Sequence, residues 1–502
     1  MMNFANSYWF GCFRGCYRYG RRRKRVIFAI LVFTCLCFPL LFETSAMQQK
    51  TPTFNVRDVA EYSHQDQEAV SFIEITSGKN NPNTNPSTAL DRDHGNIEKV
   101  NDVFKVPEPL LKGNTACPKI AEEPGFRDIV EGAVVYSVWF DDRKSQHFIR
   151  ILMLTSKWNL PSITCFFKSA LKQETFSSKA WFYEHNENHA NRRFGAFVAS
   201  CPVPQTLDSK PCLVNISATI KSTKRKLSNT KVFQVRYIGR QSGDEKSRVR
   251  SKYGICIPPV HGDVSVERII EFLELAQILG TSHFTFYDFA MSEKVRNVLK
   301  YYQDIGLVSV FRWNLPSYTK DQVHYFAQPL AVWECLFRSM RNLDFVAFHD
   351  LDEFIVPLRH ENISALLEYI HKEKHCGHCF ESVLFDPSTD QNGSLLMTQR
   401  DFHRTSKVTP YYTKCIVDPR RIFEQGIHHI SKPNEEFYHA DKVNWNIARV
   451  FHYRKCKIPG AQHNPGCSAF IVDKTMQKFG DKLLTNFKLR MKAVVSAKQQ
   501  NA

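Results

Sequence analysis

Residues 344–357, DFVAFHDLDEFIVP, decide the fold of this chain, because an apolar run there stops at a group of acidic residues and then resumes. The run 345–348 is short, contains two aromatic residues and follows a polar turn, which predicts a buried strand. Asp350 and Asp352 therefore emerge where that strand ends. Ligands bind at the carboxyl ends of strands in open α/β sheets, so this pair predicts a Mn²⁺ or Mg²⁺ site shared with a diphosphate. The alternative is a solvated acidic turn.

The N-terminus predicts a membrane anchor. Residues 1–25 carry seven basic side chains and no acidic one, and an apolar run follows at 26–42. As a helix, this run reaches roughly 25 Å, close to the thickness of thinner bilayers. The basic leader predicts a cytoplasmic tail at 1–25 and a lumenal remainder. A cleaved signal peptide, with residues 44–46 (TSA) as the cleavage site, is the alternative.

Charge and cysteine usage agree with a lumenal chain. The formal net charge is +17, of which the tail supplies +7, leaving +10 (17 − 7). The basic cluster 221–226 suggests nucleic-acid binding, but nucleic acid is not expected as a partner in a lumenal compartment. Eleven cysteines lie beyond the anchor. They predict several disulfides and, because the count is odd, at least one cysteine outside them.

Two shorter motifs carry weaker signals. Residues 376–379 (CGHC) have the spacing of a zinc site, but no second such pair accompanies them, so a disulfide or a turn is the prediction. Acceptor sequons at Asn215, Asn362 and Asn392 are consistent with a lumenal location.

Hydrophobic patterning divides the lumenal part. Residues 43–115 are polar and predict a flexible stem. Residues 116–245 predict a small β-rich accessory region without a catalytic constellation, with strands at 133–140, 147–154, 162–167, 212–216 and 231–237. The catalytic domain is predicted at 250–472. An amphipathic, basic tail is predicted at 473–502.

The catalytic domain alternates strands with helices. Strands are predicted at 253–257, 283–287, 307–311 and 345–348, and helices between them at 265–280, 295–302 and 321–340. This order is typical of a Rossmann-like parallel sheet, with the acidic motif after the fourth strand. GxGxxG, Walker, HExxH and GxSxG motifs do not occur, so dinucleotide dehydrogenases, P-loop enzymes, zincins and serine hydrolases lose their usual signatures.

Several short motifs, in this order and spacing, carry a family resemblance: 257–262 (IPPVHG), 328–336 (QPLAVWECL), 349–354 (HDLDEF), 414–419 (KCIVDP), 426–428 (GIH) and 451–454 (FHYR). Over about 250–460 the chain resembles glycosyltransferase family 92. Membership implies an α/β, GT-A-like mixed sheet, metal-dependent inverting transfer and single-pass type II anchoring in the Golgi membrane. Characterised members transfer galactose from a UDP donor to fucose on N-glycan cores or to galactan. Residues 333–335 (WEC) replace a common Asn-Asp-Cys-like triplet, which leaves the acceptor open.

The resemblance also implies roles for particular residues. It implies that the metal is held by Asp350 and Asp352 together with a histidine, either His452 or His428. Donor contacts are expected from Asp288, Pro258, His261 and Asp350. A carboxylate downstream of the metal motif would act as the base, and the candidates are Asp401, Asp386 and Glu381. Two other functions stay open: a catalytically inactive Golgi glycan-binding protein of the same fold, and a lumenal metal-dependent phosphoester hydrolase.

Overall fold

The computed structural model describes residues 97–100, 124–169, 174–189, 191–221, 226–239, 252–387, 393–456, 467 and 469–500. The predicted cytoplasmic tail, the predicted anchor and the predicted stem other than 97–100 lie outside these ranges. Within them, no helix is long and apolar enough to cross a membrane.

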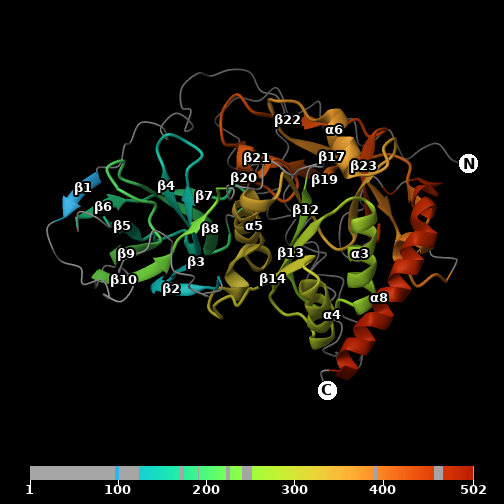
Figure 1. The fold of residues 1–502 in the computed structure, drawn as a ribbon, viewed down its shortest axis with the longest axis horizontal. Coiled ribbons are helices and arrows are strands. Elements are labelled where there is room, and N and C mark those ends of the chain that lie inside the picture. The colour runs from blue at the N-terminus through green and yellow to red at the C-terminus, as the bar shows by residue number, and fades with distance from the viewer. Residues whose placement is uncertain are drawn as a thin grey trace, which may run out of the picture. The chain divides into compact units, whose positions relative to one another are not determined.

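The N-terminal part of the described chain is a pair of β-sheets (Figure 1). One sheet has the strand order β1-β6-β5-β9-β10, and the other has the order β11-β3-β4-β8-β7, with β2 paired to β3. The strands are β1 (Ile97–Val100), β2 (Arg127–Val130), β3 (Ala133–Asp141), β4 (Phe148–Ser156), β5 (Ser162–Lys168), β6 (Thr175–Lys179), β7 (Trp181–Glu184), β8 (Phe194–Pro202), β9 (Leu213–Lys221), β10 (Lys226–Gln234) and β11 (Arg236–Tyr237).

Strands form at all five predicted positions, and β1 adds a strand inside the predicted stem. β1 pairs with β6 in the antiparallel sense, so residues 97–100 of the predicted stem belong to this sheet. The Cys165–Cys201 disulfide joins β5 of one sheet to β8 of the other. An apolar core that includes Phe167 and Ile216 fills the space between the two sheets. This region is therefore a small β-sandwich.

Strands β3 and β8 are buried along their whole length because both of their faces are covered. One face contributes to the sandwich core. The other contributes Tyr136, Trp139 and Val198 to a second core, shared with helix α5 (Gln328–Asn342). In strands covered on both faces, apolar and polar residues do not alternate, so their sequences are nearly continuous apolar runs.

The catalytic domain begins with four parallel strands in the order β14-β13-β12-β15. They are β12 (Tyr253–Val260), β13 (His283–Asp288), β14 (Val308–Arg312) and β15 (Phe345–Phe348). Helices α3 (Val266–Ile278) and α4 (Glu293–Asp304) start at the caps Ser265 and Ser292, whose side chains accept hydrogen bonds from backbone N–H groups. Figure 1 shows α3 and α5 on opposite sides of these strands.

Antiparallel pairing extends this sheet, because β19 pairs with β15 and then with β17. The fold is therefore mixed α/β, as predicted. The remaining elements are β16 (Glu353–Pro357), α6 (Ile363–Ile370), β17 (His375–Phe385), α7 (Met397–Arg400), β18 (His403–Thr405), β19 (Thr409–Val417), β20 (Ile422–Gln425), β21 (Ile430–Pro433), β22 (His439–Lys442), β23 (Ala448–Tyr453) and β24 (Phe470–Val472).

In the catalytic domain, the largest differences from the predicted boundaries are at the start of one helix and the end of one strand. The helix predicted at 321–340 begins at Gln328, because Tyr325, Phe326 and Ala327 all have left-handed backbone angles. Short 3₁₀ turns occupy Lys320–Gln322 and His324–Ala327 instead. The strand predicted to end at residue 257 continues to Val260, with an irregularity in its pairing between Cys256 and Pro259.

Helix α8 (Gly480–Gln500) covers part of the residues predicted as a C-terminal tail. Its Leu483 and Phe487 are buried in the core that includes α3. Arg490 donates a hydrogen bond of 2.9 Å to Glu274 of α3. This segment therefore packs against the catalytic domain.

Candidate active site

The predicted acidic motif forms a tight turn between β15 and β16. Glu353 N donates to the Asp350 carbonyl at 3.3 Å, and Asp350 N donates to Glu353 Oε2 at 3.0 Å. This reciprocal pair fixes the carboxylates at the end of β15, which is the carboxyl end of the parallel strands. The pairing of β16 with β23 then sets His452 directly opposite Glu353.

A buried lysine from β19 provides the positive charge at this turn. Lys414 Nζ lies 3.0 Å from Glu353 Oε2 and 3.8 Å from Asp350 Oδ2, and only 1% of the Lys414 and Glu353 side chains is exposed. Burial works against the charge on Glu353, but Lys414, His452 and His349 outweigh it and lower its pKa to about 2. Burial likewise opposes the charge on Lys414, and its carboxylate neighbours nevertheless raise its pKa. The pair therefore stays ionised.

His452 lies between two carboxylates of the turn. Its Nε2 is 3.6 Å from Asp352 Oδ2, and its Nδ1 is 3.5 Å from Glu353 Oε1. Burial disfavours the imidazolium, but Glu353 and Asp352 more than offset this effect and raise the pKa of His452.

Asp350 combines a raised pKa with a partly exposed side chain. Withdrawal from solvent raises its pKa to about 7; Lys414 opposes this rise, and the charges of Glu353 and Asp352 add to it. Its side chain is still 43% exposed, against 1% for Glu353. Asp350 is thus accessible to a ligand and binds a proton near neutral pH.

The two histidines proposed as metal ligands differ in their contacts. His452 faces Asp352, whereas His428 Nδ1 lies 3.2 Å from the Thr413 carbonyl. Burial lowers the pKa of His428 to about 3, so its ring is neutral. Carboxylate oxygens suit Mg²⁺ and Mn²⁺, and Asp352 with His452 brings an oxygen and a nitrogen to within 3.6 Å. The donor set fits such an ion, provided that Asp350 and His452 release protons to it.

The residues predicted to contact the donor lie along the ends of the strands. Asp288 ends β13 and forms an ion pair of 2.6 Å with Arg296. The His261 ring packs 4.3 Å from the Phe326 ring. Pro258 lines a pocket together with Tyr287, His349 and Ile427. This pocket therefore reaches from β12 and β13 to the residue that precedes Asp350.

The three base candidates have defined partners. Glu381 Oε1 lies 2.7 Å from Lys442 Nζ. Asp386 accepts a hydrogen bond from Cys456 N at 2.9 Å. Asp401 is buried and accepts one from His403 N, also at 2.9 Å.

Another carboxylate near this site comes from the β-sandwich, where sequence patterning gave no catalytic residue. Glu187 follows β7, and its Oε2 accepts a hydrogen bond of 2.6 Å from Ile427 N. A Cβ added to Gly426 would lie 2.8 Å from Glu187 Oε1, so a larger residue at this position would displace the carboxylate. Burial raises the pKa of Glu187 to about 7, although hydrogen bonds and Lys414 oppose the rise.

Lys414 and Glu187 were missed for the same reason. Both sit in strand or loop segments whose apolar patterns say nothing about distant partners. The KCIVDP and GIH motifs were available signals, since Lys414 opens the first and the second contacts Glu187.

Comparison with known proteins is consistent with this site. Residues 251–493 match the model of glycosyltransferase family 92. A β-1,4-galactosyltransferase, galt-1, from Caenorhabditis elegans is 26% identical over 344 residues, which cover 66% of this chain and 76% of that protein. A galactan β-1,4-galactosyltransferase, GALS2, from Arabidopsis thaliana is 25% identical over 219 residues, 41% of each chain.

The mixed α/β sheet, the strand-end carboxylates and these matches together define a glycosyltransferase. Through residues 251–493, the chain belongs to glycosyltransferase family 92.

Proposed function

We propose that this enzyme transfers galactose from UDP-galactose to a glycan acceptor such as the core fucose of N-glycans, in a metal-dependent, inverting reaction on a GT-A-like fold. The observation that supports it best is the acidic cluster at the strand ends, in a region that belongs to glycosyltransferase family 92. The names of two relatives as β-1,4-galactosyltransferases support the donor sugar.

In this proposal, Asp350, Asp352 and His452 hold Mn²⁺ or Mg²⁺. The ion would supply positive charge to the diphosphate as the glycosidic bond breaks. Lys414 and Glu353 act as positioning residues: their buried ion pair and the hydrogen bond from Asp350 N to the Glu353 carboxylate hold the turn. The pocket lined by Pro258, Tyr287 and His349 is small and lies beside this turn, and we propose that the nucleotide binds next to it.

The reaction joins the acceptor hydroxyl oxygen to the anomeric carbon of the donor sugar. The bond from that carbon to the diphosphate oxygen breaks, and its electron pair leaves with UDP. The hydroxyl proton must pass to a base whose pKa lies near the working pH.

Glu187 is the carboxylate that best meets the demand for a base. Its pKa of about 7 is matched to proton transfer at neutral pH. Its partner Ile427 lines the pocket, so the carboxylate approaches the site from the β-sandwich side. Asp401, Asp386 and Glu381 remain alternatives. If Glu187 has this role, the β-sandwich is part of the catalytic unit.

The basic leader and the apolar run at 26–42 support single-pass type II anchoring, with the enzyme in the Golgi lumen. We expect the full chain to stay in the membrane fraction after alkaline carbonate washing. A secreted protein that begins near Met47 would instead indicate a cleaved signal.

The direct test of the proposed function is a donor and acceptor screen with the full chain. UDP release is measured from several UDP-sugars with Mn²⁺, with and without a glycan array. Transfer from UDP-galactose supports the proposal. Glycan binding without turnover would favour the inactive glycan-binding protein, and release of phosphate from phosphoesters would favour the hydrolase.

The base is tested by Glu187→Gln, with the exposed neighbour Glu184→Gln as the matched control. General-base catalysis contributes about 10²–10⁴-fold, so Glu187→Gln should lower kcat by that factor and leave donor KM unchanged. A kcat equal to that of Glu184→Gln would exclude Glu187.

A further inference from the structure

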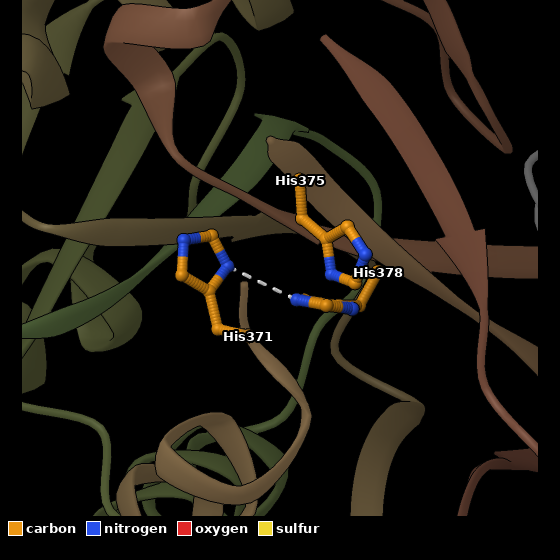
Figure 2. Close-up of side chains that lie close together, drawn as sticks. All are labelled: His371, His375 and His378. Carbon is orange, nitrogen blue, oxygen red and sulfur yellow. Dashed lines mark hydrogen bonds between the residues drawn. The ribbon is translucent and has the colours of Figure 1, made fainter. Parts of the chain in front are cut away.

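Three histidines converge at a place that the proposed reaction does not use (Figure 2). His371 follows the last residue of α6, and His375 and His378 lie on β17. One ring nitrogen from each side chain lies within 4.8 Å of the others. In the part of the chain that the structure describes, this is the only trio of histidine, cysteine or acidic side chains placed in this way.

A local irregularity of β17 makes the convergence possible. Residues three apart on a regular strand point to opposite faces of the sheet. The pairing of β17 with β22 shifts register between His375 and Gly377, which lets His375 and His378 turn toward the same side. The loop between α6 and β17 then brings His371 to both of them.

The spacing suits a tetrahedral transition-metal ion. His371 Nδ1 and His378 Nε2 are 3.1 Å apart. Zinc–nitrogen bonds of about 2.0–2.1 Å place two tetrahedral ligands about 3.3 Å apart. Figure 2 shows the His375 ring beside this pair. Imidazole nitrogens suit Zn²⁺, whereas carboxylate oxygens suit hard cations such as Mg²⁺.

The chemical state of the three rings also suits metal binding. The buried Nδ1 atom of His375 has no hydrogen-bond partner among the described residues. Burial, reinforced by neighbouring positive or ionisable groups, lowers the pKa of His371 to about 4 and of His378 to about 3. Burial also lowers the pKa of His375. All three rings are therefore neutral at pH 7, the state that a metal requires.

A carboxylate lies near the His378 nitrogen that does not face His371. Asp441 Oδ2 lies 3.8 Å from His378 Nδ1, whereas the other ring nitrogen of His378 faces His371. Metal-bound histidines commonly direct their second nitrogen to a carboxylate, which orients the ring. Cys376 is not part of this arrangement, because its buried thiol joins the core beside α5 and burial raises its pKa to about 11.

The histidine cluster is separate from the acidic cluster. Leu384 of β17 pairs with His452, and His378 lies six residues earlier on the same strand. At about 3.3 Å per residue, this separation is roughly 20 Å. One ion cannot serve both places.

We propose that His371, His375 and His378 bind Zn²⁺, with Asp441 orienting His378. The bound ion ties the end of α6 to the beginning of β17. A fourth position stays available to water, since three side chains supply the ligands.

The test uses the full chain, purified without a polyhistidine tag, stripped with a chelator and dialysed against Zn²⁺. Elemental analysis should find one zinc per chain in the wild type, and Co²⁺ in its place should give the visible absorption of a tetrahedral site. His371→Ala and His378→Ala should each lose the zinc and the Co²⁺ spectrum. His360→Ala and Asp352→Asn are the matched controls and should retain both.

His371 is partly exposed and lies outside regular structure, so His371→Ala keeps the test valid if His378→Ala fails to fold. Asp441→Asn should weaken zinc binding about 10–100-fold without abolishing it. Zinc should also raise Tm in the wild type and not in His371→Ala. The proposal is overturned if the wild type binds no zinc, or if His371→Ala binds as much as the wild type.

Discussion

The acidic cluster and the histidine cluster lie near opposite ends of β17. Ionisable groups are packed together in both, but they are charged in the first and neutral in the second. At the acidic end, Glu353 and Lys414 neutralise each other at 3.0 Å and stay charged although both are buried. At the other end, His371, His375 and His378 have no comparable counter-charge within the trio, and burial keeps them neutral. This contrast underlies the two metal proposals, a hard cation at the first cluster and zinc at the second.

Removing the counter-charge of the acidic cluster should have the largest effect on stability. Lys414→Met leaves Glu353 buried without its partner, which costs about 3–5 kcal/mol of unfolding free energy. Chemical denaturation at pH 7 measures the loss. The double variant Lys414→Met, Glu353→Gln should recover part of it. If the two single losses simply add, the buried ion pair does not stabilise the turn.

The stability lost in Lys414→Met should also depend on pH. The pKa of Glu353 falls from 4.5 to about 2 on folding, so its stabilising contribution is complete above pH 4.5 and disappears as the pH falls toward 2. The penalty of Lys414→Met should therefore be smaller at pH 4 than at pH 7. An equal penalty at both values would show that packing, not charge, explains it.

Metal binding by the two clusters should respond differently to pH, because protons compete with the metal at only one of them. Asp350 has a pKa of about 7 and must be deprotonated to bind a cation. Its ionised fraction rises about tenfold between pH 6 and pH 8, and Mn²⁺ affinity should rise by at least that factor. Zinc retention by the histidine cluster should not change over this range, because the pKa of His371 is about 4, that of His378 is about 3, and burial lowers the pKa of His375 as well. Calorimetric titrations with each ion give both profiles.

The smallest effect is expected at an exposed ion pair on the same sheet. Lys442 lies 2.7 Å from Glu381, but its side chain is 66% exposed. Exposed pairs contribute about 0–1 kcal/mol, so Lys442→Met should be close to neutral where Lys414→Met is not. A loss at Lys442 as large as that at Lys414 would show that burial does not set the difference.

The sequence predicted what depends on local pattern. The four parallel strands, the helices α3 and α4 between the first three of them in sequence, and the acidic residues after β15 all follow from apolar periodicity. The start of α5 was missed because three non-glycine residues adopt left-handed backbone angles, which no local preference favours.

What the sequence could not predict depends on contacts between distant segments. Glu187 and Ile427 are 240 residues apart, and their hydrogen bond joins the β-sandwich to the catalytic domain. The histidine cluster depends on the irregular register of β17, which periodicity cannot reveal. The CGHC segment was expected to form a disulfide or a turn. Cys379 does form a disulfide, but with Cys415, while His378 joins the histidine cluster.

The central claim is that the acidic strand end is the donor and metal site, and Asp352→Asn tests it most directly. The change preserves shape and removes one charge that faces His452. UDP release from UDP-galactose is measured in saturating Mn²⁺, with Asp304→Asn on the surface of α4 as the control. We expect a fall of at least about 10²-fold, since each ~1.4 kcal/mol of lost transition-state stabilisation is a factor of ten. Wild-type UDP release by folded Asp352→Asn protein, with an unchanged Tm, would contradict the claim.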